Sequence, residues 1–579
     1  MRIALSRVLA SAVLATACAG PRPPEAAWPQ AGGPHGTWTL PEATAPTSFS
    51  VDRGDAIAWK TTLPTAGQSG ICVAGGRLYL TCLAPWEPGT PVTPRLPLST
   101  DVIGLCVDAD TGVILWQIDI PGTVGSPNLY AYSDSSSPTP CTDGERIFFV
   151  NASGGIACCT PEGEVLWRRS WTPWGNREGY PFNKQFEPFV AGHCLVNLEP
   201  RDDGDPRAAK GWNFLRGLDA ATGATRWIAD DATTTYNTPT LGRTAGGELA
   251  IVHGRGGWHG VPEEPVGLSM TRATGTGAGS TVWRYVASTG ADGQPLTDPG
   301  TLHAPTWQAL YVQHWDEDRV TWFVHNPIES HLLIDAQTGL EIARQPLGSH
   351  VDWWDFDQAA GTYTARLGVD LRTQRDDAPR MAFDPDEHTL VVHPAWHCNV
   401  VTHGYHWFLC STAHGRNAAP NPTRPGTRGV AGPAHCVGRV HLETGRVEYL
   451  ELPVEVRHAP QDRTAWTYGT AQRTSTHDAR GIDAAAEDRS RTDGWQIPAF
   501  WASPIAVGDA VYFTTTQGLV YVLDATASRL DPSALLSVSD LGAQGETWAM
   551  GNLATDGRGS LFARTAKELI RIRQPNGDR

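Results

Sequence analysis

Short apolar runs bounded by glycine recur along most of this chain. Residues 77–80, 146–149 and 510–513 are such runs, each directly after a glycine-containing turn, and residues 519–523 follow Gly518. Runs of about five residues between turn residues are typical of buried strands, because helices need longer segments with a 3.6-residue period. The pattern therefore predicts many short strands joined by tight turns.

One turn recurs with a fixed sequence: an apolar run, Asp, two residues, Thr-Gly, three residues and Trp. It is complete at residues 108–116 and 219–227, and residues 335–339 repeat it without the Trp. Gly tolerates a positive φ, and Asp and Thr oxygens accept backbone N–H groups, so the motif suits a hairpin turn. Weaker copies stand at Gly163 with Trp167, Gly279 with Trp283, Gly445 with Tyr449, the Asp524 region and Trp59.

The spacing of these copies predicts the architecture. The marker positions lie near residues 59, 116, 167, 227, 283, 343, 449 and 528, most of them 51–60 residues apart. Each unit holds roughly four short strands, and such units repeated radially are propeller blades. We therefore expect an all-β propeller of eight blades of four antiparallel strands, with seven blades as the alternative. Strands from the two chain ends should pair, because ring closure removes an open edge.

The Asp-x-x-Thr-Gly-x-x-x-Trp unit resembles the tryptophan docking motif of the pyrroloquinoline quinone (PQQ) repeat β-propellers, which include quinoprotein alcohol dehydrogenases and BamB-like lipoproteins. The resemblance implies that these tryptophans pack between adjacent blades. It assigns blade docking to Trp59, Trp116, Trp167, Trp227 and Trp283. Residues 28–34 also resemble the start of secreted bacterial PQQ-repeat proteins. We expect a leading segment at residues 19–45 and the propeller at residues 46–579, with loop insertions near 344–440 and 455–495.

The N-terminus has the pattern of an export signal. Arg2 and Arg7 flank the start of an apolar stretch at residues 8–17, which is too short to span a bilayer. Small residues then lead to Cys18, as in the bacterial lipobox, although Ala15 stands where that motif usually has Leu. We expect a signal peptide at residues 1–18 with lipidation of Cys18; cleavage without lipidation is the alternative. The protein is then exported to the periplasm, outer membrane or cell surface of a bacterium, with no transmembrane segment.

Composition supports this picture and excludes one class of partner. The chain has 579 residues with 61 Gly, 44 Pro and 23 Trp, and its formal net charge is −16. Frequent Gly and Pro disfavour a helical bundle. A negative surface repels phosphate backbones, so nucleic acid is not an expected partner. The cysteines contain no C-x-x-C pair, so zinc-ribbon, thioredoxin-type and c-type haem sites have no support.

The resemblance also suggests cofactor chemistry. PQQ enzymes of the family bind the cofactor with Ca²⁺ and cover it with a disulfide between two adjacent cysteines. Cys158 and Cys159 are adjacent here, in an apolar run directly before a turn. Neighbouring side chains of a strand point to opposite faces, so we do not expect them to form a disulfide. We assign no catalytic residue and predict no cofactor; PQQ with Ca²⁺ belongs only to an alternative function.

The best candidate for a ligand site is the loop at residues 253–264, where His253, Arg255, His259 and Glu263 stand among glycines. Glycine lets the backbone approach a ligand, an Arg fork binds carboxylate or phosphate, and His and Glu can exchange protons. A surface loop between blade strands explains the same residues without a ligand. Residues 171–188, rich in aromatic and amide side chains, could line the same face.

A second cluster, of histidine and cysteine, spans residues 393–414. Its count suggests a metal site, since both residue types ligate zinc. The spacing, however, is that of a strand hairpin at residues 400–410 with incidental histidines. We therefore expect no metal site.

These observations favour a binding or scaffold protein at the cell envelope over an enzyme. Its partner would be an envelope protein or a small ligand that meets loops at one face of the propeller. The alternative is a PQQ-dependent, quinoprotein-type oxidoreductase, and a carbohydrate-processing or sugar-sensing propeller is a third hypothesis. One fold hosts many functions, so the choice between them depends on the site.

Overall fold

The repeated turn forms because one aspartate oxygen organises it. In the copy at residues 108–112, Asp108 Oδ1 accepts hydrogen bonds from the backbone N–H groups of Asp110 and Thr111 and from the Thr111 hydroxyl. Gly112 closes the turn with a φ of 75°, in the region that favours glycine. Residues 219–223 and 335–339 form the same turn, so the sequence repeat is also a structural repeat.

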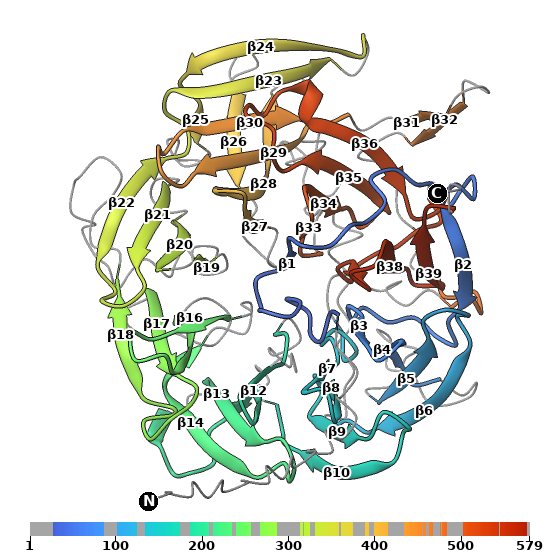
Figure 1. The fold of residues 1–579 in the computed structure, drawn as a ribbon, viewed down its shortest axis with the longest axis vertical. Helices are drawn as coiled ribbons and strands as arrows, with labels where there is room; N and C mark the ends of the chain where they lie inside the picture. Colours follow the sequence, from blue (N-terminus) through green and yellow to red (C-terminus); the bar gives the residue numbers. More distant parts are fainter. Residues whose placement is uncertain are drawn as a thin grey trace, which may run out of the picture.

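The computed structural model describes residues 27–85, 101–123, 134–173, 186–207, 212–233, 239–255, 267–286, 313–316, 318–324, 330–357, 360–373, 388–392, 399–414, 434–453, 456–458, 463–466, 475, 477–482, 502–543 and 545–575. Its strands form eight blades arranged in a ring (Figure 1). This confirms the all-β propeller and the prediction of eight blades rather than seven. No helix in these described ranges is long and apolar enough to cross a membrane.

Blades 1 to 5 follow one another in the sequence, each running from its innermost to its outermost strand. Blade 1 consists of β3 (Cys72–Ala74), β4 (Arg77–Leu83), β5 (Val102–Asp108) and β6 (Ile114–Ile120). Blade 2 consists of β7 (Cys141–Thr142), β8 (Ile147–Asn151), β9 (Gly155–Cys159) and β10 (Val165–Ser170). Blade 3 consists of β11 (Phe189–Ala191), β12 (Cys194–Pro200), β13 (Asn213–Asp219) and β14 (Thr225–Thr233). Blade 4 consists of β15 (Thr240–Arg243), β16 (Leu249–Arg255), β17 (Gly267–Arg272) and β18 (Thr281–Tyr285). Blade 5 consists of β19 (Gln313–Asp316), β20 (Arg319–Val324), β21 (Ser330–Asp335) and β22 (Glu341–Pro346).

Blade 6 carries additional strands. Its four-stranded unit is β27 (Asn399–Thr402), β28 (Tyr405–His414), β29 (Ala434–His441) and β30 (Val447–Glu451). A hairpin of β23 (Val351–Asp357) and β24 (Thr362–Val369) extends its outer edge, because β23 pairs in parallel with β30. On the inner side, β26 (His388–Val392) pairs with β28, and β25 (Arg372–Thr373) pairs with β26. A separate two-stranded sheet is formed by β31 (Val456–His458) and β32 (Arg463–Trp466).

The last two blades close the ring. Blade 7 consists of β33 (Ile505–Val507), β34 (Ala510–Thr514), β35 (Leu519–Asp524) and β36 (Leu535–Asp540), with the short 3₁₀ helix η5 (Pro532–Ala534) before β36. Blade 8 combines β37 (Ala554–Thr555), β38 (Ser560–Arg564) and β39 (Glu568–Arg573) with β2 (Ile57–Thr62) from the start of the chain. The antiparallel pairing of β2 with β39 is the expected closure by the two chain ends.

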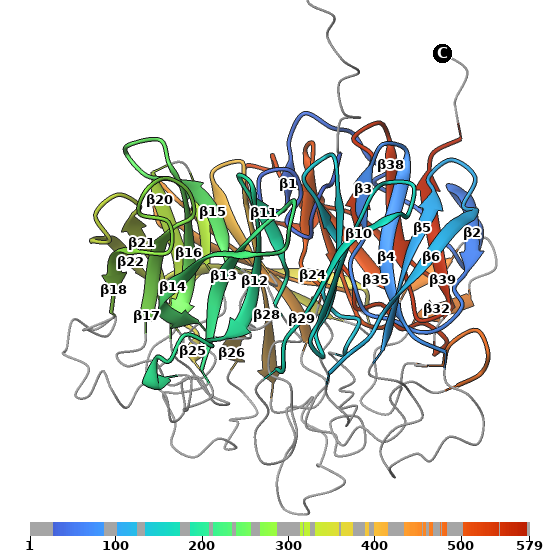
Figure 2. The same cartoon turned by 90° about the horizontal axis from the view of Figure 1, so that it is seen from below.

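The two faces of the ring differ. In each blade, the turn after the innermost strand lies at the same end as the turn before the outermost strand. Backbone hydrogen bonds join the two turns directly: Ala109 N donates to Gly76 O, Ala220 N to His193 O and Ala336 N to Asp318 O. We call this end the short-turn face; it is the upper side of the ring in Figure 2. The opposite end, the long-loop face, carries the connections between second and third strands and between successive blades.

The leading segment enters the central channel and returns. Trp28 forms an antiparallel bridge with Val73 of β3, which runs toward the short-turn face, so the chain enters from that face. The segment then turns back as β1 (Thr39–Leu40), which pairs in parallel with β33. Figure 1 shows residues 27–40 crossing the centre of the ring. Part of the channel is therefore filled by the chain's own N-terminal residues.

Backbone and amide hydrogen bonds hold this segment to several blades. Thr142 N of blade 2 donates to Pro29 O, and Val190 N of blade 3 donates to Gln30 Oε1 at 3.0 Å. Asn552 Nδ2, just before blade 8, donates to Ala31 O at 3.2 Å, and Ala506 N of blade 7 donates to the carbonyl of Trp38. The leading segment thus fixes the channel-facing strands from both halves of the ring.

Candidate functional site

The repeated tryptophans lie at the junctions between blades. The indole Nε1 atoms of Trp59, Trp116, Trp167 and Trp283 each donate a hydrogen bond of 2.9–3.1 Å to a carbonyl in the turn of the next blade. Trp227 differs: its ring lies over Gly217 of its own blade, and the next blade has no Asp-x-x-Thr-Gly turn. These indoles are therefore occupied by contacts within the propeller.

The proposed ligand residues His253 and Arg255 end β16 and point into the protein. Both side chains are buried, between blades 3 and 4. His253 Nε2 lies 3.0 Å from Thr271 Oγ1, and Arg255 Nε lies 3.8 Å from Asp231 Oδ2. Their side chains thus anchor the base of the 253–264 loop. His259 and Glu263 lie outside the described residues, so the structure does not bring the four candidates together.

Asp231 is the centre of this buried cluster. Arg284 donates two hydrogen bonds to its carboxylate, at 2.8 and 2.9 Å, and Ser269 Oγ donates a third at 2.7 Å. Burial would raise the pKa of Asp231, but the hydrogen bonds from Arg284 and Ser269 and the nearby charge of Arg255 outweigh it and hold the pKa at about 2. Burial lowers the pKa of His253 to about 4, so this imidazole is neutral near pH 7.

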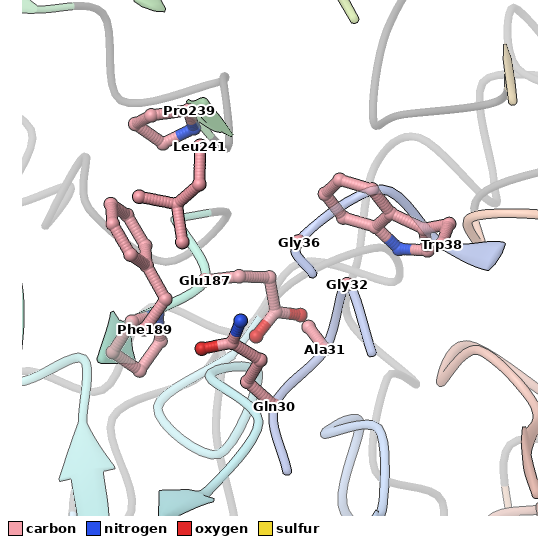
Figure 3. Close-up of a pocket in the computed structure, with 10 residues that line it drawn as sticks. Gln30, Ala31, Gly32, Gly36, Trp38, Glu187, Phe189, Pro239 and Leu241 are labelled. Carbon is pink, nitrogen blue, oxygen red and sulfur yellow. The ribbon is translucent and has the colours of Figure 1, made fainter. Parts of the chain in front are cut away.

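A small pocket in the channel lies between the leading segment and blades 3 and 4. Gln30, Trp38, Glu187, Phe189 and Leu241 are among its lining residues (Figure 3). It has room for about one water molecule, so it is no site for an organic cofactor. Glu187 Oε2 accepts a hydrogen bond of 2.6 Å from Thr139 N. Burial raises the pKa of Glu187 to about 7.

Polar residues that precede the innermost strands link neighbouring blades around the channel. Gly70 N donates to Thr139 Oγ1 at 2.9 Å, and Thr139 N donates to Glu187. Gln68 N donates to Ser136 Oγ at 3.0 Å. Residues 67–70 and 137–140 thus join blades 1, 2 and 3.

A cluster of buried histidines lies between blades 5 and 6. His331 Nε2 is 3.0 Å from His406 Nδ1, and His406 Nε2 is 2.6 Å from Asn399 Oδ1. His314 Nε2 is 3.2 Å from the carbonyl of Asn399, and its ring packs edge-on against Trp38. Burial lowers the pKa of His314 to about 4 and that of His331 to about 3, and burial with the two neighbouring histidines holds the pKa of His406 well below its usual value.

Only part of this cluster belongs to the His/Cys-rich stretch. His406 does, and β27 and β28 form the expected hairpin. His314 and His331 come from blade 5, and the sequence did not single them out. His393, His397 and Cys398 lie outside the described residues. Within the described ranges, no group of three or more His, Cys, Asp or Glu residues is arranged to hold a metal ion.

Cys158 and Cys159 are free and buried in β9. Cys158 packs with Phe148 and Leu195 toward blade 3, whereas Cys159 packs with Tyr79 and Phe149 toward blade 1. Their thiols thus point to opposite faces of the blade. The two cysteines have the geometry of packing residues and do not form a cover over a channel ligand.

Comparisons with known proteins found one family model and several solved structures that are similar to this chain. The family model described as outer membrane protein assembly factor BamB matches residues 99–262. The quinohemoprotein alcohol dehydrogenase from Comamonas testosteroni aligns with a TM-score of 0.51 at 12% identity, covering 95% of this chain and 81% of that chain. Quinohemoprotein alcohol dehydrogenase ADHIIG from Pseudomonas putida gives a TM-score of 0.49 at 12% identity, with 96% and 81% covered. BamB from Moraxella catarrhalis gives a TM-score of 0.34 at 10% identity, and the alignment covers 75% of this chain and 95% of that chain.

No curated protein sequence matches this chain. At 12% identity, the likeness to the alcohol dehydrogenase shows the fold alone. The chain has the PQQ-like repeat propeller fold that its turn motif predicts, and its role depends on its own residues.

Proposed function

We propose that this PQQ-repeat propeller is an exported, lipid-anchored binding or scaffold protein of the bacterial cell envelope. One observation carries the proposal: the leading segment occupies the channel, with Trp28 paired to blade 1 and the carbonyl of Trp38 bonded to blade 7. The pocket that the described residues form beside it has room for about one water molecule. A partner is then bound on the outer surface, by loops that the rigid ring holds in place.

The parts that a PQQ enzyme needs do not fit the described residues. The two adjacent cysteines face different blades, and no described cluster of His, Cys, Asp or Glu suits a metal such as Ca²⁺. The quinoprotein-type oxidoreductase therefore stays the alternative, and no reaction step is derived for it.

The long-loop face is the proposed contact surface, and the 253–264 loop is its first candidate. Its base is fixed by the buried Arg255 and Asp231, and its sequence holds the candidate ligand residues His259 and Glu263. We expect the partner to be an envelope protein or a small ligand. The net charge of −16 favours a basic or neutral partner surface.

The loop is tested by replacing residues 256–264 with a Gly-Ser linker in the full chain. The matched control replaces the turn at residues 244–248, in the same blade but on the short-turn face. Chemical cross-linking in intact cells, followed by mass spectrometry, identifies neighbours. The proposal expects a reproducible envelope partner that the loop replacement loses and the turn replacement keeps. Equal cross-linking in all three proteins would show that this loop is not the contact.

The cofactor alternative needs a separate assay. The purified chain is incubated with PQQ and Ca²⁺, and bound cofactor is followed by absorbance and by dye-linked alcohol oxidation. Stoichiometric PQQ uptake that depends on Ca²⁺ would favour the oxidoreductase and count against a purely binding role.

A further inference from the structure

Two cysteines stand directly opposite each other on neighbouring strands of blade 6. Cys410 of β28 is paired in register with Cys436 of β29, within a ladder of eight residue pairs that has no register shift. Opposite residues of an antiparallel pair have Cα atoms about 4.5 or 5.5 Å apart and Cβ atoms on the same face of the sheet. A disulfide joins Cα atoms that are about 4.4–6.8 Å apart. The register therefore places the two cysteines within the distance that a disulfide spans.

The alignment of these two strands is held from both sides. β26 pairs with β28 and places Val392 beside Cys410, and β30 pairs with β29 and places Glu451 beside Cys436 (Figure 1). A slip of one residue would turn the buried face of a strand outward. Cys436 is fully buried in the apolar core that joins blades 4, 5 and 6. The opposition of the two cysteines is thus a fixed feature of the fold.

Other cysteines of the described strands lack this relation. Cys72 and Cys106 share a row of blade 1, and Cys141 and Cys158 share a row of blade 2. In each row, an aromatic residue of the intervening strand lies between the two cysteines. Two strand spacings are about 9–10 Å, which exceeds the reach of a disulfide. Among the strand pairs of the described ranges, no other two cysteines stand opposite each other.

We propose that Cys410 and Cys436 form a disulfide that closes the base of the connection between β28 and β29. This connection, residues 415–433, joins a second strand to a third and so belongs to the long-loop face. The bond lies two residue pairs before the end of the ladder, so the base of the connection stays closed even when the end of the ladder frays. The inference goes beyond the proposed function, because the pairing follows from the register and needs no lipid anchor. Export matters only for the compartment that supplies the oxidant.

The bond forms by thiol–disulfide exchange with a small-molecule disulfide or an oxidised thiol oxidoreductase. The thiolate of one cysteine attacks a sulfur of the oxidant, which gives a mixed disulfide and releases the first reduced thiol. The thiolate of the second cysteine attacks the protein sulfur of the mixed disulfide, forms the Sγ–Sγ bond and releases the second thiol. Two electrons pass from the protein to the oxidant, and the two cysteine protons are balanced by those on the released thiols.

Glutathione buffers of different ratios of oxidised to reduced form test the pairing in the purified full chain. Remaining thiols are blocked with N-ethylmaleimide, and the unreduced protein is digested with trypsin. Trypsin cuts between the two cysteines and leaves them in peptides 381–416 and 429–439. Because Cys398 also lies in the first peptide, Cys398→Ser is the matched control for Cys410→Ser. Mass spectrometry identifies joined and blocked peptides.

We expect the two peptides to be joined in oxidising buffer and to be separate, each with its cysteines blocked, in reducing buffer. Cys410→Ser should lose the link, and Cys398→Ser should keep it. The midpoint of thermal unfolding should be a few degrees higher for the oxidised than for the reduced protein, and Cys410→Ser should abolish this difference. Blocked thiols at both positions in every oxidising buffer, or a link from Cys436 to Cys398, would overturn the proposal.

Blocking the thiols in intact cells before lysis separates this proposal from the proposed export. A link that is present in cells and also forms in glutathione buffer supports both. A link that forms only in the buffer supports the pairing but indicates a reducing compartment, which counts against export.

Discussion

Trp59 donates an indole hydrogen bond to the carbonyl of Ala109, 3.1 Å away, and so ties blade 8 to blade 1 at the seam where the ring closes. Trp59→Phe keeps an aromatic ring but removes the donor, and should lower the free energy of unfolding by about 1 kcal/mol. Trp59→Ala also removes half-buried ring contacts and should cost about 3 kcal/mol. Urea unfolding of each variant measures both values.

Lys60→Ala is the control for the seam. Lys60 is the next residue of β2, is exposed, and makes only a surface ion pair of 3.4 Å with Glu568. Its loss should change stability by less than about 1 kcal/mol. An equal effect of Trp59→Ala and Lys60→Ala would mean that the indole does not stabilise the closure.

Gly112 is required both by its positive φ and by the lack of room for a side chain. Gly76 shares only the first of these constraints, so it serves as the comparison. The φ of Gly112 is 75°, and an added Cβ would lie 2.5 Å from Thr61 Oγ1 and 2.8 Å from the Trp59 ring. Gly76 has a similar φ of 73°, but nothing lies within 4 Å of an added Cβ. Gly76→Ala should cost only the backbone strain, about 1–2 kcal/mol. Gly112→Ala should cost about 1 kcal/mol or more beyond that, because Thr61 and the indole of Trp59 must move.

Thermal unfolding of the two glycine variants checks this difference. If Gly112→Ala and Gly76→Ala have the same midpoint, the close approach of Trp59 to the turn contributes nothing to stability. A lower midpoint for Gly112→Ala would show that the added methyl is strained against Thr61 and Trp59 at the blade junction.

Local chemistry explains how much of the fold could be predicted. The Asp-x-x-Thr-Gly turn is stabilised by atoms within five residues, as Asp108 and Thr111 show. Each copy can therefore be recognised from the sequence alone. Counting the copies then predicts the blades. The parallel addition of β23 to β30 was not predicted, because it pairs Trp353 with Tyr449 and no local pattern encodes a partner so far along the chain.

The candidate site was less predictable for the same reason. His253 and Arg255 looked like ligand residues beside glycines, but the register of β16 with β17 turns them toward Thr271 and Asp231. The contact of His331 with His406 joins residues 75 positions apart in different blades. Such contacts depend on how blades pack, which a one-dimensional pattern does not contain.

The buried histidines predict a loss of stability in mild acid. An unfolded His has a pKa near 6.5, whereas burial lowers the pKa of His314 to about 4. The unfolded state then binds more protons between these values, so stability is complete above pH 6.5 and falls as the pH drops toward 4. His314 alone should contribute a loss of about 2 kcal/mol between pH 7 and pH 5.

His314→Phe tests whether this histidine causes the predicted loss of stability as the pH falls. The variant loses the bond to Asn399 O and should be less stable at pH 7, but its further loss between pH 7 and pH 5 should be smaller than that of the natural protein. His35→Phe, at an exposed position, is the matched control for the substitution itself. An unaltered pH dependence in His314→Phe would rule out this histidine as a source of acid sensitivity.

Asp231 contacts two arginine side chains that differ in their exposure to solvent. Asp231 and Arg255 are both buried, whereas the Arg284 side chain is 50% exposed. Asp231→Ala removes the buried carboxylate that Arg255, Arg284 and Ser269 contact and should cost about 3–5 kcal/mol. Arg284→Ala removes the hydrogen bonds of 2.8 and 2.9 Å to the buried Asp231 carboxylate and should cost about 2 kcal/mol. Urea unfolding at pH 7 compares the two variants.

Since Arg255 ends β16 and holds the base of the 253–264 loop, Asp231→Ala should also reduce cross-linking of the partner through that loop, while Arg284→Ala should preserve it. A loss in Arg284→Ala as large as that in Asp231→Ala would show that the cluster depends on the hydrogen bonds from Arg284 and not on the contact with Arg255.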